Sequence, residues 1–455
     1  MIDNFIVLTY LIMILVIGIY YRSKSGNFKS YANVKDSTRK NKLILVATIF
    51  ASSVGGGTTF GIAEKAFSGD ISYSYGLILT LPVDLLVAYY IVPRIIKHYG
   101  AESVGDIMSK YYGTIGRFIT GIASVIVSVG LVAAQISVSG HIFRYILKID
   151  YIEGVVLSYG IVIIYTTIGG LRSIMFTNLL QFFAMILAIP VITLCGLYKI
   201  GLQNFILEFP VEKISIISNS SVLENTISAT LGFAVMGLYP NFIQRALIND
   251  NPSDTSRAIY IKSAIYVLFL TFVTLNGLIA YNLYPSQDSN LALPYLIDQI
   301  IPTGVQGLVV VGLLAAVMST ADSDLNVTSV TLVKDIFNPI LKLKNQQTLL
   351  LIARITNIII GSLAIIIALN FKSVVDLVVF VAGFWGPMIV VPLVFALFDI
   401  TISRMMFILS SLGGGISFLL WEYGLIHPLN LKGVFVGTLV SFIIFCLGMM
   451  RKPRY

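Results

Sequence analysis

Long apolar segments separated by short polar stretches follow one another along almost the whole chain. A helix needs about 20 apolar residues to cross a bilayer, so apolar runs of that order are predicted membrane spans. Thirteen runs meet this criterion, at residues 4–21, 42–67, 72–96, 116–147, 152–168, 173–199, 227–247, 257–284, 302–334, 346–369, 374–397, 401–421 and 432–450. The pattern predicts an all-α integral membrane protein with about 13 transmembrane helices in a single membrane domain over residues 1–455.

The composition agrees with a chain that mostly faces lipid. Apolar residues make up 57% and charged residues 11% of the chain, whereas about 25% charged residues is usual in soluble proteins. The net charge of +8 therefore bears on orientation rather than on a nucleic-acid partner. With the N-terminus outside, roughly three quarters of the 30 basic residues fall on the inner side. This predicts a multi-pass protein of the cytoplasmic (inner) membrane with a cytoplasmic C-terminus.

Few residues are available for metal or catalytic chemistry. The chain has two cysteines and three histidines, and none of them has a metal-ligand or disulfide spacing. Nothing resembles a nucleotide-binding loop, and we expect no appended catalytic domain. We expect neither an enzyme nor a pump driven by ATP, and no organic cofactor; any uphill transport must use an ion gradient.

The second apolar run is interrupted by Gly55, Gly56 and Gly57 within a hydroxyl-rich stretch, residues 51–59. Each glycine costs about 1 kcal/mol against alanine in a helix, so the triplet favours an unwound segment. Close helix packing is the alternative, and it is preferred for the second triplet at 413–415, which has less polar company. Unwinding would make Ser53, Gly55, Gly56, Gly57 and Thr58 candidates for a substrate pocket.

A second interruption lies in the seventh run, where Tyr239 and Pro240 follow Gly237. Proline removes a backbone donor and crowds the preceding turn. Two broken helices, five helices apart, are typical of transporters built from inverted repeats with a binding site at the membrane midplane. We expect a leading helix at 4–21, repeats at 42–199 and 227–397, and two additional C-terminal helices within 401–450.

Polar residues also gather inside the ninth run. On a helix, Ala316, Ser319, Thr320 and Ser323 share one face, and Asp322 lies beside them. Hydroxyl and carbonyl oxygens suit a hard monovalent cation, and acids at membrane depth are costly unless they are paired or bind an ion. Alternatively, the hydroxyls bond to their own helix carbonyls and the acids lie at an aqueous end.

Three segments resemble the sodium/solute symporter family. The stretch Tyr165–Ser173 is similar to the glycine-pair motif of the fifth core helix, the stretch 316–320 to the sodium motif of the eighth, and Gln244–Arg245 follows the sixth. The resemblance covers about residues 4–400 and implies a ten-helix inverted repeat with broken first and sixth core helices. It also implies a main sodium site made of the carbonyls of Ala51, Val54 and Ala316 and the hydroxyls of Ser319 and Thr320.

The chain departs from the family at one position. Many members have an aspartate in the fifth core helix, where this chain has Asn178. We hypothesise that the carboxylate has moved to the eighth core helix, giving a second cation site of Ser319, Asp322, Ser323 and Asn178. The alternative is that no second site exists and that Asp322 pairs with a base such as Arg245 or Arg172.

Other isolated polar residues are candidates for the substrate pocket. Asp84 stands among apolar residues of the third run, where it would meet a cationic substrate group or serve as a structural acid. Trp385 would line a pocket or anchor a helix at the membrane interface. Gln135 and Tyr239 complete this set of candidates.

These features favour a sodium-coupled symporter that imports a small organic solute by alternating access. Its expected ligands are sodium, the only metal ion expected, and the solute, in a lipid bilayer and without an obligate protein partner. Proline or another amino acid is the first expectation, with a quaternary ammonium such as choline, or pantothenate, as alternatives. Proton coupling through Asp322 or Asp84 is the alternative for the driving ion. A channel would not need two broken helices, and a sensor would need a signalling domain.

Overall fold

The computed structural model describes residues 2–34, 41–207, 220–370, 374–424 and 431–450, apart from a few side chains within these ranges, and the regular structure there is helical. The first half contains α1 (Ile2–Tyr21), η1 (Arg22–Ser25), α2 (Phe28–Ala32), α3 (Lys42–Ala51), η3 (Gly57–Gly61), α4 (Ile62–Ser68), α5 (Ser72–Ile78), α6 (Leu81–Leu86), η4 (Val87–Ile91), α7 (Val92–Ile96), α8 (Val104–Tyr145), α9 (Tyr151–Ile200) and α10 (Leu202–Leu207).

The second half contains α12 (Ser220–Met236), α13 (Pro240–Ala246), α14 (Pro252–Leu283), η5 (Ser289–Leu291), α15 (Ala292–Ile300), α16 (Val305–Thr331), η6 (Leu332–Phe337), α17 (Asn338–Leu341), α18 (Gln346–Asn370), α19 (Val374–Trp385), η7 (Gly386–Val390), α20 (Val391–Leu397), α21 (Arg404–Glu422) and α22 (Gly433–Met450). The all-α fold predicted from the sequence is confirmed.

Each predicted apolar run falls on helical segments of the structure. Nine helices in the described part of the chain are long and apolar enough to cross a membrane, and Lys42–Ala51 and Gly383–Leu397 form shorter apolar helices. The predicted spans 152–168 and 173–199 are the two parts of α9, which bends at Gly170 (φ 62°). This left-handed backbone conformation is open to glycine at little cost. The number thirteen and the inverted repeat stay predictions.

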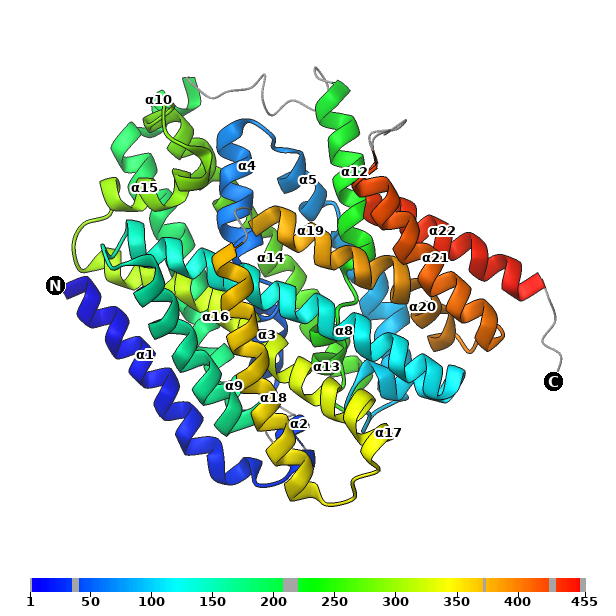
Figure 1. Cartoon of the computed structure of the whole chain (residues 1–455). Coiled ribbons are helices and arrows are strands. Elements are labelled where there is room, and N and C mark those ends of the chain that lie inside the picture. The colour runs from blue at the N-terminus through cyan, green and yellow to red at the C-terminus, as the bar shows by residue number, and fades with distance from the viewer. Residues whose placement is uncertain (1, 35–40, 208–219, 371–373, 425–430, 451–455) are drawn as a thin grey trace.

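The centre of the molecule is formed by α16, which packs against α9 and α8 (Figure 1). Every residue of α16 from Leu313 to Thr331 is buried, including its serines, threonines, aspartates and asparagine. Buried polar groups cost free energy unless they have hydrogen-bond partners. The polar side chains of α16 therefore need partners in the helix itself or in the elements packed against it. The α21–α22 pair lies at the opposite side of the molecule from α1 (Figure 1).

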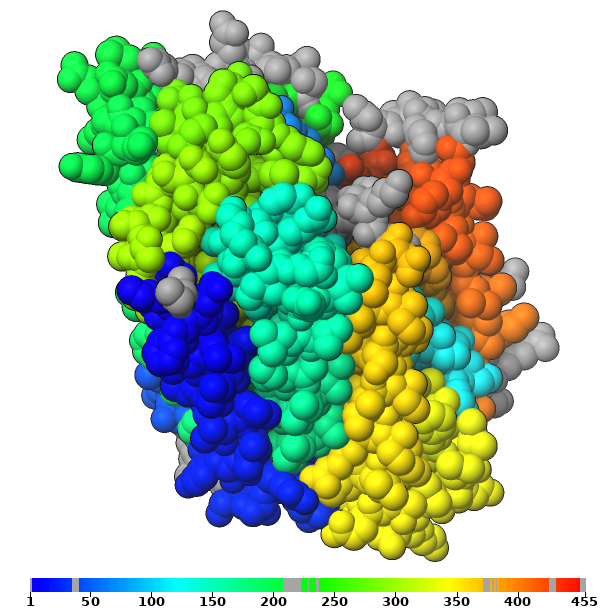
Figure 2. Space-filling view, turned by 60° about the vertical axis from the view of Figure 1, so that its left-hand side comes forward, coloured from blue at the N-terminus to red at the C-terminus, as the bar shows by residue number. Residues whose placement is uncertain are grey.

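The leading helix α1 lies along α9 and also contacts α16 (Figures 1 and 2). Its Asp3 carboxylate accepts hydrogen bonds from the backbone N–H groups of Gly304 and Gly307, at 2.8 and 2.6 Å. Gly304 is the N-cap residue of α16 and Gly307 lies in its first turn, where backbone N–H groups have no intrahelical partners and negative charge is favoured. Asp3 thus caps α16 from another helix and ties α1 to the central element.

Both predicted interruptions are breaks in helical structure. Helix α3 ends at Ala51, and the backbone returns to a regular helical turn only at η3. Helix α12 ends at Met236, and α13 begins at Pro240, the position where proline lacks the N–H that a helix start leaves free. The breaks expose backbone carbonyls inside a membrane protein, which is tolerated only where they are buried in protein or line a cavity.

Candidate functional site

The break after α3 faces the middle of α16. Ser319 Oγ donates to the carbonyl of Ala51 at 2.9 Å and to that of Ala316 at 3.1 Å. Thr320 Oγ1 donates to the carbonyl of Val54 at 2.6 Å and lies 3.4 Å from that of Ala51. The structure therefore brings together all five oxygens of the sodium site that the family resemblance implied.

These five oxygens are neutral and buried, and they come from two elements. Ala51 and Val54 belong to the break, whereas Ala316, Ser319 and Thr320 belong to α16. Carbonyl oxygens of an unwound segment together with helix hydroxyls are the donors that hold sodium in transporters with broken helices. A bound cation would accept lone pairs from both hydroxyls while the hydroxyl protons turn away, so the donor set fits a monovalent cation.

The glycines after the break permit a close approach of α8. The Gly56 N–H donates to Gln135 Oε1 at 2.6 Å. A Cβ atom would lie 2.8 Å from that same oxygen at Gly55 and 2.5 Å from Val138 at Gly56. The Gln135 amide thus satisfies a backbone donor that the break leaves free, and only glycine leaves it room to do so.

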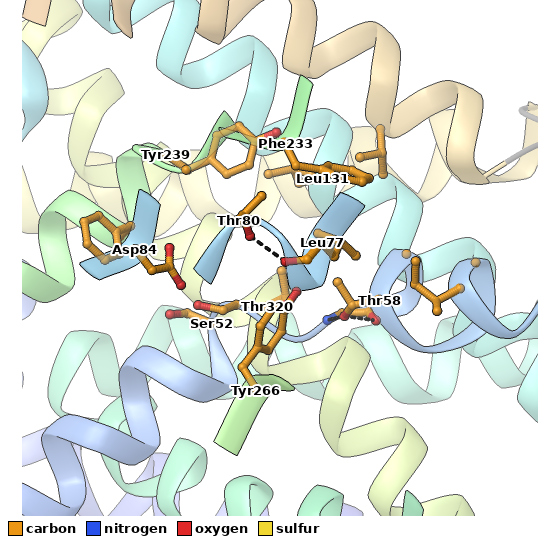
Figure 3. A pocket seen from close by; sticks show the side chains of 18 of the residues that line it. Ser52, Thr58, Leu77, Thr80, Asp84, Leu131, Phe233, Tyr239, Tyr266 and Thr320 are labelled. Atoms are coloured by element: carbon orange, nitrogen blue, oxygen red, sulfur yellow. Dashed lines mark hydrogen bonds between the residues drawn. The ribbon is translucent and has the colours of Figure 1, made fainter. Parts of the chain in front are cut away.

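A cavity of about 250 Å³ opens beside the break. Among its walls are the side chains of α4, α5, α6, α8, α14 and both interruptions (Figure 3). Figure 3 shows Ser52 and Thr320 on one side of it and Leu131 and Phe233 on the other. The predicted pocket residues that line it are Ser53, Gly55, Gly57, Thr58, Asp84, Gln135 and Tyr239.

Two predicted pocket residues do not line this cavity. Gly56 directs its N–H to Gln135 instead. Trp385 is fully buried, and its Nε1 donates to the carbonyl of Leu238 at 2.7 Å. The indole therefore satisfies a carbonyl at the second interruption and acts neither as a pocket wall nor as an interfacial anchor. The expectation that Trp385 lines the pocket was wrong, because spacing along the chain does not reveal a partner 147 residues away.

Asp84 lines the cavity, but it already has a cationic partner. Lys262 Nζ of α14 lies 2.9 Å from Asp84 Oδ2, and Ser263 Oγ donates to the same oxygen at 2.9 Å. The ammonium of Lys262 also lies 4.7 Å from the ring centre of Tyr266. The acid therefore faces the cavity and is held in an ion pair.

Asp322 lies one turn beyond the five oxygens, among donors that are already present. Tyr165 Oη donates to Oδ2 at 2.5 Å, with Thr177 at 3.4 Å from it, and Ser323 Oγ donates to Oδ1 at 3.2 Å. Arg245 Nη2 in turn donates to Ser323 Oγ at 2.7 Å. The Arg245 guanidinium, fully buried, attracts the carboxylates of both Asp322 and Asp324.

The structure does not assemble the second cation site as predicted. Asn178 donates to Thr48 at 2.9 Å rather than approaching Asp322, and the neighbouring Thr177 reaches Asp322 instead. The guanidinium on Ser323 places a positive charge where the second cation was expected. These contacts favour the alternative in which Arg245 serves Asp322.

Several residues of these clusters were missed in the sequence. Lys262 and Lys65 both line the cavity, and neither was predicted as a site residue. Tyr165 lies in the stretch that resembles the glycine-pair motif, and no role at the site was predicted for it. Lys262 could have been identified from the sequence, because it is a basic residue inside an apolar run and such a charge requires a partner.

Comparison with known proteins decides the family. The model of the sodium:solute symporter family matches residues 41–406. The chain belongs to this family. It is therefore a membrane transporter rather than an enzyme.

Curated relatives of this symporter family member share about a fifth of its residues. The sodium/sialic acid symporter NanT of Aliivibrio fischeri is 22% identical over 389 residues, which cover 80% of this chain and 75% of NanT. The high-affinity proline transporter PutP of Bacillus subtilis is 23% identical over 406 residues, covering 83% of this chain and 84% of PutP.

A solved structure shares the fold of this family member. The substrate-bound, outward-open structure of a Na⁺-coupled sialic acid symporter superposes with a TM-score of 0.83 at 18% identity, covering 99% of this chain and 98% of the other. The likeness shows the shared architecture of the two chains.

Proposed function

We propose that this symporter couples the downhill movement of sodium to the import of a small organic solute, with the ion held by Ala51, Val54, Ala316, Ser319 and Thr320. The observation that carries the proposal is the convergence of three carbonyls and two hydroxyls across the first break, with Ser319 and Thr320 within 2.6–3.4 Å of the break carbonyls. The family supports sodium as the coupling ion.

Sodium at this position would couple to the solute through the break itself. The ion would join the break after α3 to α16, while Thr320 and Ser52 also line the cavity. A ligand shifts a conformational equilibrium only by its differential affinity for the two states. Sodium would bind the conformation in which the break after α3 lies close to α16, and it would not bind one in which the two are separated. The ion would therefore favour the conformation in which the solute cavity is formed.

We propose a single coupling ion. Arg245 supplies a fixed positive charge to Asp322 and Asp324, and its hydrogen bond to Ser323 occupies one of the expected ligands of a second cation. We further propose that the chain lies in the cytoplasmic membrane with its N-terminus outside, on the distribution of basic residues. The two inverted repeats at 42–199 and 227–397 belong to the same proposal.

The relatives differ in what their names say they carry. Sialic acid, proline and glucose differ in net charge and size. Membership of the family therefore does not select a solute for this chain, and the choice among an amino acid, a quaternary ammonium and another solute must come from the cavity.

The test is solute uptake by proteoliposomes under imposed gradients. The purified protein is supplied with a panel of labelled solutes, and inward gradients of sodium, lithium or protons are imposed separately. We expect accumulation with sodium and its loss in the double variant Ser319→Ala/Thr320→Ala. Accumulation driven by protons alone, and unchanged in that double variant, would overturn the proposal and favour proton coupling.

A further inference from the structure

We infer that the solute of this transporter is a small organic anion whose carboxylate binds Lys65 of α4. The inference rests on the proposed function, because it concerns the solute that would share the cavity with sodium. It narrows the solute to one charge class and assigns a residue to its recognition.

The charged side chains of the cavity do not balance. Its described lining contains two ammonium groups, Lys65 and Lys262, and one carboxylate, Asp84. Asp84 is held by Lys262 at 2.9 Å and by Ser263. This pair is neutral as a whole, so the charge of Lys65 is left over.

Lys65 has no acidic partner in the part of the chain that the structure describes: no carboxylate there lies within 4.0 Å of its Nζ. Its ammonium lies over the face of the Tyr73 ring, 5.3 Å from the ring centre. Lys432 stands near the same ring at 5.4 Å, but Glu422 and Asp70 attract that ammonium. Lys65 is partly exposed and faces the cavity, and an ionisable residue that faces a cavity between membrane helices is a candidate for substrate binding.

The ion site adds a further positive charge to this environment. Thr320 contributes its hydroxyl to the five oxygens and also lines the cavity. Sodium would therefore bind beside a cavity that already carries an ammonium without an acidic partner among the described residues. Like charges repel strongly in surroundings of low dielectric constant. An organic anion would neutralise the arrangement, whereas a quaternary ammonium would add a third cation.

A zwitterionic amino acid fits the lining less well. Its carboxylate could use Lys65, but its ammonium would need an acidic partner, and the single described carboxylate of the cavity is bound to Lys262. Most of the remaining wall is apolar or aromatic, including Leu77, Leu131 and Phe233. The volume of about 250 Å³ lies just below the range of about 300–1,000 Å³ that is usual for small-molecule pockets. A small solute with one carboxylate fits the ammonium of Lys65, the mainly apolar wall and the small volume of the cavity.

The experiment measures how solutes of matched shape and different charge stabilise the purified protein in sodium. The probes are pairs of a carboxylate and its amide: lactate with lactamide, nicotinate with nicotinamide, and proline with prolinamide, together with choline. Binding is followed as the shift in Tm with and without sodium. The variants are Lys65→Gln and Lys65→Arg, and Lys148→Gln is the control because Lys148 is an exposed base in an ion pair with Asp298.

We expect lactate or nicotinate to raise Tm in sodium, and no amide, choline or the zwitterion proline to match that shift. A hydrogen bond to a charged group contributes enough that Lys65→Gln should weaken this binding about tenfold to a hundredfold. Lys65→Arg should retain most of it, and Lys148→Gln should behave as the wild type. The shift produced by sodium alone should be the same in wild type and Lys65→Gln, because the ion ligands are untouched.

The possible results separate the two proposals. Sodium-dependent binding of an amide, of choline or of proline alone would overturn the anion inference while leaving sodium coupling intact. So would anion binding that is unchanged in Lys65→Gln, or no response to lactate or nicotinate. Loss of every sodium-dependent shift in the wild type would instead overturn the proposed function.

Discussion

Two polar clusters lie one turn apart on α16, and they answer the same physical problem in different ways. The first, Ser319 and Thr320, offers neutral oxygens to the break carbonyls of Ala51 and Val54. The second, Asp322 and Ser323, contains a carboxylate and is contacted by Tyr165 and Arg245. Both clusters are buried, but only the second contains its own cation.

The comparison shows that a charged cluster and a neutral cluster differ in whether they can bind and release an ion. A buried carboxylate needs a partner, and in this structure the guanidinium of Arg245 supplies the positive charge near Asp322 and Asp324. Neutral carbonyls and hydroxyls satisfy one another by hydrogen bonds when no ion is present. The neutral cluster is therefore the one that can take up and release an ion without leaving a charge uncompensated.

Removing the resident cation should produce the largest effect. In Arg245→Met the carboxylates of Asp322 and Asp324 lose their shared positive charge, and stripping one partner from a buried ionic cluster typically costs about 3–5 kcal/mol. We expect a large drop in Tm in sodium-free buffer, partly recovered by adding Asp322→Asn. Thermal unfolding in detergent measures it.

The control for this experiment is Arg354→Met. The Arg354 guanidinium donates to the backbone carbonyls of Thr167 and Ile168. These acceptors are uncharged, so removing the guanidinium does not take a charge partner from a buried carboxylate through these contacts. An Arg245→Met protein as stable as the wild type would contradict the role given to the guanidinium.

Removing an oxygen from the neutral cluster should instead affect sodium more than stability. We expect Thr320→Ala to weaken sodium binding about a hundredfold, since even groups that only support metal ligands contribute 10- to 100-fold. Ser323→Ala is the matched control, because it removes a hydroxyl from the same helix one turn away. The sodium-dependent Tm shift should be lost in the first variant and kept in the second. Equal losses would remove the distinction between the clusters.

The cavity pair extends the comparison to a third site. Asp84→Asn leaves Lys262 without its carboxylate, and losing a hydrogen-bonded charge partner costs about 1–3 kcal/mol. The double variant Asp84→Asn/Lys262→Met should regain part of this loss, because the uncompensated ammonium is removed with it. Thermal unfolding of the single and double variants tests this, and a strictly additive result would argue against a functioning ion pair.

The smallest effect is expected at the far end of α16. Asp3→Ala removes the acceptor for the N–H groups of Gly304 and Gly307, and loss of such a cap costs about 1 kcal/mol. Asp3→Asn keeps an acceptor and should cost less. Sodium binding should be unchanged in both variants, so a weakened sodium response would mean that α1 reaches the ion site through α16.

The two glycine triplets show what the sequence could predict. Hydroxyl-rich flanks predicted unwinding at 55–57, and the helix is broken over residues 52–55, up to the first glycine of the triplet. The triplet 413–415 was assigned to packing, and α21 continues through it. At Gly414 a Cβ atom would lie 2.3 Å from the Pro387 carbonyl. Local composition was enough to distinguish the two triplets, because whether a glycine-rich segment unwinds depends on the residues next to it in the sequence.

Contacts between distant helices could not be predicted in the same way. The family resemblance supplied the five oxygens, and a helical face supplied the α16 positions among them. The partners of Asp84 and Trp385 are 178 and 147 residues away, and spacing within one helix gives no information about them. The same limit applies to Asn178, whose amide turns to Thr48 because the orientation of α9 is set by packing against several helices.

Equilibrium binding of radioactive sodium to the purified protein tests the central claim most directly. The account predicts one saturable sodium ion per chain, lost in Ser319→Ala/Thr320→Ala and retained in Asp322→Asn. Two ions per chain in the wild type, with one of them lost in Asp322→Asn, or binding that survives the loss of both hydroxyls, would contradict it.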